Sequence, residues 1–353
     1  MSLACPSIAV TVHETPSDFR LLQDGWKDLF ERHGGWNVFL SWEWFHRWWQ
    51  SFGDAHELHL IALRQENRLV GIVPAMVETT EGGERQFALI GSDRTTDYCD
   101  VLVAPEFQDR LLAALADTIA QGFGRWARAE LRNLPQGSPL LGAFLDEIGR
   151  RGMRAEVRES ATCPVARLAP TWDEYLATLS KKDRHELRRK IRRSQSCGEP
   201  QILRMERPAA IEEGLADFFR LHRASASEKA AFLDPEMETF FRRMVLSLSQ
   251  RGWVRLNLMK LDGVGVAASL SFCCGDRVLL YNSGLDPECR HLCVGIALHA
   301  AEMQDAIDQG KEYYDFLRGD EPYKYDLGGR DTPIYTLTVL PQQSGGESPD
   351  GRG

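Results

Sequence analysis

The sequence predicts an α/β fold made of two units, each a mixed but mostly antiparallel sheet flanked by helices. The chain has 353 residues, which is long enough for two domains, and its 43% apolar and 26% charged residues are ordinary for a soluble globular protein. Segments with helical and strand periodicity alternate along it. Both halves also share one order of elements, in which helices precede a β-meander and a further helix and strand follow it.

We therefore place one domain at residues 1–165 and a second at residues 166–341. The common order suggests a structural duplication without visible sequence repetition. Residues 342–353 are rich in Gly, Ser and Pro, and we expect them to form a disordered tail.

The first half begins with a strand over residues 8–14 and a helix from Ser17 to His33. A second helix follows from residue 39, with Ser41 as its N-cap. Its aromatic residues recur at helical spacing, which favours core packing over a ligand-stacking platform. The pattern of the remaining segments predicts strands at 57–64, 68–77, 86–91, 99–103, 127–133 and 153–159, and helices at 107–121 and 138–151.

The second half opens with one long helix over residues 172–196, which Thr171 caps and Gly198 and Pro200 end. Residues 181–193 of this helix hold eight Lys or Arg against two acids, a local charge of about +6 in a chain of net charge −9. The pattern beyond it predicts helices at 208–224, 235–251 and 292–309, and strands at 201–206, 253–261, 264–274, 277–284, 312–317 and 335–340, the last of which would close the sheet of this half.

Composition and charge argue against several classes of protein. A net charge of −9 does not suit a DNA-binding protein. No apolar run approaches the roughly 20 residues of a membrane span, and the first residues lack the features of a secretory signal. The eight cysteines are scattered, without a CxxC pair, so we expect reduced thiols and no metal site in a cytoplasmic protein.

Ionisable residues are unusually dense after the predicted strand at 312–317. Arg318, Asp320, Glu321, Tyr323 and Lys324 fall within seven positions, around one Gly and one Pro. A strand end that projects acids, a base and a phenol into one place is typical of a site where protons move. The alternative is a solvated strand-to-loop junction with ordinary surface ion pairs.

A second candidate site lies where the predicted strand at 277–284 runs through a short turn into the helix at 292–309. The first amides of a helix are unpaired, and Gly295 would let the backbone approach a ligand, so this junction would seat a pyrophosphate. An ordinary helix cap is the alternative. The residues that we assign to a cofactor here are Ser283, Gly284, Leu285, Cys293, Val294 and Gly295.

Three segments together resemble the GNAT acyltransferases. More narrowly, they resemble the two-domain proteins grouped with CelD-type cellulose-biosynthesis acetyltransferases, which are akin to the FemAB peptidyltransferases. The segments are Ser41-Trp42-Glu43-Trp44 through Trp49 with Gly71, Pro74 and Asp97-Tyr98-x-Asp100; the basic helix with Arg188-Arg189 and Arg192-Arg193; and Tyr281-x-x-Gly284-x-Asp286 with Tyr314 through Lys324. The turn from Arg290 to Gly295 holds less Gly and Arg than single-domain GNATs have before their cofactor helix.

The resemblance implies tandem GNAT-like domains, acetyl-CoA or another acyl-CoA as donor, and transfer to an amine of a small molecule or amino sugar in polysaccharide or secondary metabolism. The acyl-pantetheine would lie between the strands on either side of the cofactor helix. Asp320 or Glu321 would be the base, directly or through water, and Tyr323 the acid. Lys324 or Arg318 would hold an anionic part of the substrate or the pantetheine carbonyl. Because a carboxylate is a weak base for an ammonium, we expect one of the two acids to be partly desolvated.

Further candidates would bind the substrate. Arg223, with Glu228 and Lys229 shortly after it, would line the same cleft or belong to an ordinary surface. Residues at the mouth of a first-domain strand would recognise an amino or hydroxyl group of the acceptor across the domain interface. Alternatively, Asp97 caps a turn and Asp100 pairs with a surface base. The full substrate-binding set is Asp97, Tyr98, Asp100, Arg223, Asp315 and Arg318.

Two other functions stay open. The basic helix would suit a solvated surface, the CoA 3′-phosphate or an anionic glycan. If it contacted tRNA phosphates instead, the chain would be an aminoacyl-tRNA-dependent peptidyltransferase of FemAB type. A GNAT-like shell could also be a non-catalytic scaffold of a polysaccharide synthase. The sequence leaves the acceptor, the acyl chain length and the oligomeric state open.

Overall fold

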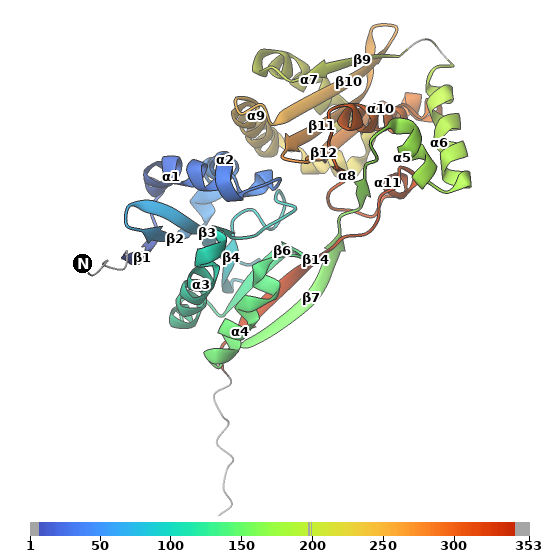
Figure 1. The fold of residues 1–353 in the computed structure, drawn as a ribbon. Helices are drawn as coiled ribbons and strands as arrows, with labels where there is room; N and C mark the ends of the chain where they lie inside the picture. The colour runs from blue at the N-terminus through green and yellow to red at the C-terminus, as the bar shows by residue number, and fades with distance from the viewer. Residues whose placement is uncertain (1–6, 197, 199, 343–353) are drawn as a thin grey trace, which may run out of the picture. The chain divides into compact units, whose positions relative to one another are not determined.

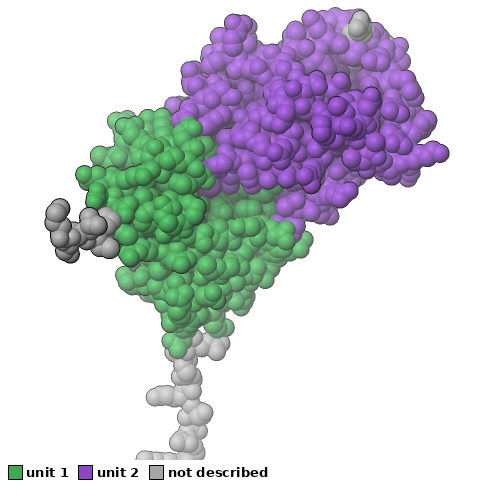
Figure 2. Space-filling model, viewed as in Figure 1, with its two compact units in different colours: residues 1–33, 53–160, 334–353 green, residues 34–52, 161–333 purple. Residues whose placement is uncertain are grey.

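The structure is a computed structural model that describes residues 7–196, 198 and 200–342, in two compact units (Figure 2). The first unit comprises the described parts of Met1–His33, Gly53–Ser160 and Ile334–Gly353, and the second those of Gly34–Phe52 and Ala161–Pro333. Of the tail expected at 342–353, residues 343–353 lie outside the described residues.

The first unit is built on a sheet of eight strands in the order β1-β2-β3-β4-β6-β14-β7, with β5 paired to β3 (Figure 1). Its helices are α1 (Asp18–His33), α3 (Gln108–Gly122) and α4 (Ala143–Arg150). Phe19, Leu22 and Trp26 recur every three or four residues and give α1 its buried face. The strands are β1 (Ile8–His13), β2 (Glu57–Gln65), β3 (Arg68–Thr79), β4 (Arg85–Leu89), β5 (Leu102–Val103), β6 (Arg128–Pro135), β7 (Arg154–Thr162) and β14 (Pro333–Leu340).

The second unit is built on a sheet of six strands in the order β8-β13-β12-β11-β10-β9. The strands are β8 (Val165–Arg167), β9 (Gln201–Met205), β10 (Val254–Leu261), β11 (Val264–Cys274), β12 (Arg277–Leu285) and β13 (Tyr313–Asp315). Its helices are α2 (Trp42–Phe52), α5 (Trp172–Thr178), α6 (Lys181–Ser194), α7 (Pro208–Ser225), α8 (Ser227–Phe232), α9 (Pro235–Ser249), α10 (Val294–Asp308) and α11 (Pro322–Asp326).

Each unit contains a parallel pair of strands joined through a helix. β4 pairs in parallel with β6 after α3, and β12 pairs in parallel with β13 after α10. Other pairs, such as β2 with β3 and β10 with β11, are antiparallel. The predicted fold class of two mixed, mostly antiparallel sheets flanked by helices is confirmed.

The aromatic stripe of α2 packs in a core, as predicted, but that core belongs to the second unit. Trp44 is fully buried and makes edge-to-face contacts with Phe39 and with Phe240 of α9. Ser41 caps the helix, because its Oγ accepts a hydrogen bond from the amide of Trp44 at 3.3 Å.

The long helix predicted over residues 172–196 is wrong, because the structure has two helices there, α5 and α6. Leu179 is extended (φ −74°, ψ 153°) and ends α5. Ser180 then caps α6, with its Oγ accepting a hydrogen bond from the amide of Asp183 at 3.1 Å. A good N-cap within a helical pattern therefore starts a new helix.

The last predicted strand lies in the first unit's sheet. β14 pairs antiparallel with β6 and lies between β6 and β7. The compact units therefore differ in two places from a division of the chain at residue 165. β14 belongs to the first unit, and α2 belongs to the second. Strand periodicity indicates which face is buried but does not identify the partner strand, so the sequence could not place β14.

Two further elements are shorter than predicted. The strand expected at 99–103 is reduced to β5, because Asp100 Oδ1 accepts a hydrogen bond from the amide of Val101 and the amide of Cys99 bonds to the carbonyl of Asn133. The helix expected at 138–151 is divided at Gly142, which has non-helical dihedral angles (φ −129°, ψ −101°).

Candidate active site

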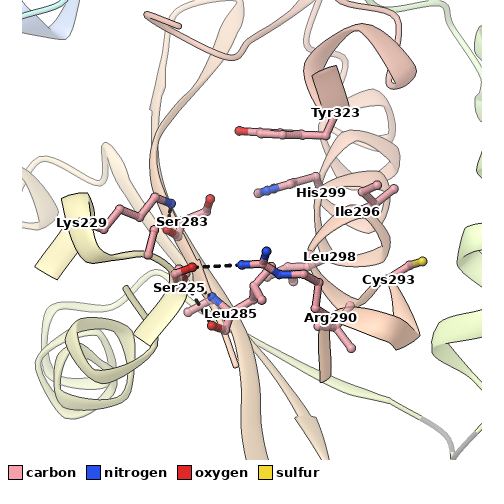
Figure 3. Close-up of a pocket in the computed structure, with 15 residues that line it drawn as sticks. Ser225, Lys229, Ser283, Leu285, Arg290, Cys293, Ile296, Leu298, His299 and Tyr323 are labelled. Carbon is pink, nitrogen blue, oxygen red and sulfur yellow. Dashed lines mark hydrogen bonds between the residues drawn. The ribbon is translucent and has the colours of Figure 1, made fainter. Parts of the chain in front are cut away.

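A pocket of about 340 Å³ lies in the second unit between the start of α10 and the end of β12 (Figure 3). The end of α7 and the start of α8 form another wall, and α11 contributes Tyr323. All six residues assigned to the cofactor from the sequence line this pocket: Ser283, Gly284, Leu285, Cys293, Val294 and Gly295. Its volume lies within the range of small-molecule sites.

One wall of the pocket is the start of α10. Cys293 has left-handed dihedral angles (φ 59°, ψ 29°) and separates α10 from a short 3-10 helix at Pro287–Leu292. No side chain in the described part of the chain caps α10, so its first amides and its dipole favour an anion at this end. A Cβ at Gly295 would lie 3.1 Å from Leu285 Cδ2, so glycine keeps the space between α10 and β12 open.

Gly284 has a packing role that the sequence did not reveal. A Cβ there would lie 2.3 Å from the amide nitrogen of His222 on α7. Glycine therefore lets α7 pack directly against β12, and this packing shapes the pocket wall.

Two cations, Lys229 and Arg290, lie on the polar side of the pocket (Figure 3). Lys229 Nζ donates a hydrogen bond to the carbonyl of Ser283 at 2.6 Å, and Arg290 Nη2 donates to the carbonyl of Ser225 at 3.0 Å. Burial lowers the pKa of Lys229, while the charge of Glu321 acts in the opposite direction. The sequence had suggested that Lys229 could line this cleft; it had given no role to Ser225.

Tyr323 and His299 lie next to each other at the other end of the pocket (Figure 3). Their rings stack with centroids 5.4 Å apart and an interplanar angle of 19°. Burial raises the pKa of Tyr323, and the negative charge of Glu321 raises it further, against a hydrogen bond with the Ser283 side chain. The tyrosine therefore keeps its proton at neutral pH. Sequence reasoning missed His299.

Behind His299 lies a fully buried carboxylate. Glu302 accepts hydrogen bonds from the hydroxyls of Tyr314 at 2.8 Å and of Ser269 at 3.1 Å, and Ser271 donates to its other oxygen. Burial alone would raise the pKa of Glu302, but these donors and His299 lower it overall, so the group stays ionised. His299 and Glu302 are three residues apart on α10, but this spacing alone does not indicate a buried pair.

The acids expected to act as the base do not lie in the pocket wall. Asp320 and Glu321 are both exposed, with the side chain of Glu321 54% accessible, so neither is the desolvated acid that the sequence led us to expect.

Lys324 is buried, and its ammonium donates to the carbonyls of Leu317, Arg318 and Gly319 at 2.9–3.0 Å. Leu317 and Gly319 have positive φ (55° and 117°), which turns the chain around the ammonium. Lys324 therefore holds this loop together and is not among the residues that line the pocket.

Three of the predicted substrate-binding residues lie in the second unit outside the pocket wall. Asp315 is fully buried, and its Oδ1 accepts a hydrogen bond from the amide of Leu317 at 2.9 Å. Arg223 pairs with Glu238 and donates to the carbonyl of Leu233, which ties α7 to α9. Arg318 lies on the same loop as Lys324 and is half-buried.

The other three predicted residues lie together in the first unit. Asp97 and Tyr98 are buried. Asp100 Oδ1 accepts hydrogen bonds from Ser138 Oγ and from the amide of Val101, both at 2.8 Å. Burial raises the pKa of Asp100 to about 7, because these two donors only partly offset the loss of solvent. The alternative that Asp100 pairs with a surface base is therefore wrong, and the role of all three in acceptor binding stays a prediction.

None of the described helices is long and apolar enough to span a membrane. No group of three or more His, Cys, Asp or Glu in the described part of the chain could hold a metal ion.

Residues 181–325 match the family model of the acetyltransferase (GNAT) domain. Among solved structures, FemX is similar at a TM-score of 0.65 and 13% identity, covering 95% of this chain and 98% of that one. A C-terminal domain (DUF2156) of a putative lysylphosphatidylglycerol synthetase from Agrobacterium fabrum has a TM-score of 0.59 at 12% identity, covering 94% and 93%. L-PGS from Bacillus licheniformis has a TM-score of 0.57 at 9% identity, covering 91% of each chain. At these identities the likeness concerns the fold. No curated protein matches.

Proposed function

We propose that this chain, a GNAT-superfamily acyltransferase with the two-domain fold of FemX, transfers an acyl group from acyl-CoA to an amine. The observation that supports the proposal most is the pocket itself. It joins an uncapped helix start, suited to a pyrophosphate, to a partly buried tyrosine suited to a leaving thiolate.

The donor would lie along the pocket. Its pyrophosphate would take the first amides of α10, with Arg290 beside them, and Gly295 would leave room for the pantetheine arm between α10 and β12. Lys229 would face the thioester end, a role that replaces the one first expected for Lys324. Acetyl-CoA is the simplest donor of this class.

In the proposed reaction, a neutral amine attacks the carbonyl carbon of the thioester. A C–N bond forms, the C–S bond breaks, and its electron pair goes to sulfur. Tyr323 would donate its proton to that sulfur, because burial keeps the phenol protonated until a thiolate appears beside it. The attacking nitrogen gives up one proton, which restores the phenol of Tyr323 through solvent, so the products are an amide and the free thiol of CoA. A small amine or an amino sugar is the proposed acceptor.

A second candidate function is supported by α6. Lys181, Lys182, Arg184, His185 and Arg188 line a hollow of about 630 Å³ on this helix. Such a surface would suit phosphates of an aminoacyl-tRNA donor in place of CoA. Activity that ribonuclease abolishes, and that falls steeply between 50 and about 200 mM salt, would favour this candidate.

Donor binding is the first test. A ligand at about 100 times its dissociation constant stabilises the folded state by roughly 2.7 kcal/mol, which raises the melting temperature measurably. We expect acetyl-CoA to raise it in the unmodified chain and not in Gly295→Trp, whose side chain would fill the pocket. Gly149→Trp is the matched control, because a Cβ at Gly149 meets no atom within 4 Å. The absence of any shift with acetyl-CoA, longer acyl-CoAs and CoA would contradict the proposal and favour an aminoacyl-tRNA donor.

A further inference from the structure

His299 is an unusual residue for a pocket wall. One of its ring nitrogens is inaccessible to solvent, and yet the ring points into the pocket (Figure 3). His299 as a whole is 4% exposed to solvent. Nδ1 is inaccessible and has no hydrogen-bond partner among the described residues, and it lies 3.9 Å from Glu302 Oε2. The other nitrogen, Nε2, is the one left to face the pocket.

Glu302 is a buried carboxylate with three hydroxyl donors. Burying a charge is costly unless it is compensated, so the three donors indicate a carboxylate that is kept ionised in place. The charge of Glu302 acts on His299 at close range in surroundings of low polarity. A carboxylate close to Nδ1 favours the tautomer that carries its proton there, which leaves Nε2 as the nitrogen that can accept one.

Other ionisable groups also face the His299 ring or the Glu302 carboxylate. None of them takes the place of Glu302 as the carboxylate beside the ring. Lys229 is bonded to the carbonyl of Ser283, and Arg290 to that of Ser225. Tyr323 stacks on the ring, and Tyr314 donates to the carboxylate. Cys293 lines the same pocket.

We propose that His299 is the general base of the acyl transfer and that Glu302 is its positioning residue. The inference rests on the function proposed above and replaces Asp320 and Glu321 in that role. His299 Nε2 removes a proton from the attacking nitrogen as the C–N bond forms. Tyr323 gives its proton to the sulfur as the C–S bond breaks. The imidazolium then returns its proton to the phenolate through solvent, so both residues regain their starting states.

Bromoacetyl-CoA tests the placement without a known acceptor. A nucleophile beside the acyl group displaces bromide from the CH₂ carbon, forms a C–N bond and releases one proton to solvent. We would use a Cys293→Ser background, which removes a competing thiol from the pocket, after calorimetry has shown that it still binds acetyl-CoA. The expected result is a single adduct on His299, found by peptide mass spectrometry and suppressed by excess acetyl-CoA. Labelling confined to Lys229, or none, would overturn the inference.

Variants separate the base from its partner. His299→Gln should lose the adduct and lower turnover with any accepted amine about 100-fold or more, with acetyl-CoA affinity unchanged within about twofold. His291→Gln is the matched control, because His291 is exposed and outside the pocket wall. Glu302→Gln should move the pH profile of labelling to lower pH, since the charge that favours the imidazolium is gone. A purely structural role would lower the rate at every pH without moving the profile.

Two outcomes distinguish this inference from the proposed function. If acetyl-CoA binds but His299 is neither labelled nor needed, the inference fails and the donor site stands. If acetyl-CoA does not bind, both fail. Should Glu302→Gln not fold, Tyr314→Phe gives the same test with the same sign, because losing one donor raises the pKa of the buried Glu302 carboxyl and weakens the charge beside the ring. An unmoved profile in Tyr314→Phe would then overturn the role of Glu302.

Discussion

Replacing Lys324 with Met tests whether this lysine belongs to the fold or to the chemistry. The methionine keeps the apolar stem but removes the ammonium that donates to three carbonyls at 2.9–3.0 Å and pairs with Glu321 at 2.9 Å. A buried acceptor left unpaired costs about 1–3 kcal/mol, and breaking a buried ionic group typically costs about 3–5 kcal/mol in total. We therefore expect Lys324→Met to lower the free energy of unfolding by about 3–5 kcal/mol.

The matched control is Glu321→Gln, which alters the other end of the same ion pair. Because the Glu321 side chain is 54% exposed, its loss should cost less than about 1 kcal/mol. Urea denaturation gives both values, and hydrogen exchange of the 313–326 peptide reports the loop itself. If Lys324→Met costs less than about 1 kcal/mol and yet abolishes turnover, Lys324 acts in catalysis and our reading of the loop is wrong.

The remaining predictions concern two other residues. Gly284→Ala should lower the free energy of unfolding by about 1–3 kcal/mol, measured by urea denaturation, because the new Cβ would lie 2.3 Å from the backbone of α7; an unchanged value would contradict this packing. The pKa of Asp100 is raised from 3.8 to about 7, so the folded state favours its protonated form. The free energy of unfolding should therefore fall as the pH rises from about 4 through 7, and be lower by roughly 4 kcal/mol at pH 8. Asp100→Asn keeps an acceptor for Ser138 and should be more stable than the unmodified chain at pH 8, which melting curves at pH 5 and 8 would check.

Helical and strand periodicity predicted most of the elements, because burial of one face leaves a repeating pattern in the sequence. The pocket was also predictable, since a strand, a turn and a helix with Gly295 are contiguous in the chain. The ionisable residues of 318–324 were harder. Their density indicated a special loop. The ammonium of Lys324, however, is bonded to three backbone carbonyls, and every residue type carries such a carbonyl, so the sequence does not indicate which of them will accept a hydrogen bond.

His299 could not be singled out from the sequence for a related reason. Its importance depends on Glu302, and the burial of Glu302 depends on hydroxyls that β11 and β13 bring from Ser269, Ser271 and Tyr314. A His and a Glu three residues apart on a helix are common on solvated surfaces, so spacing alone gives no preference for a buried pair.

The position of β14 has a consequence for biosynthesis. β6 and β7 are not neighbours in the first sheet until β14 fills the place between them. About 170 residues separate the end of β7 from the start of β14. At about 5–20 residues per second, the ribosome takes roughly 10–35 s to supply the missing strand. During that time two strand edges stay unpaired and could pair with another nascent chain. Expression of this protein should therefore depend on chaperones that shield strand edges more than its finished structure would suggest.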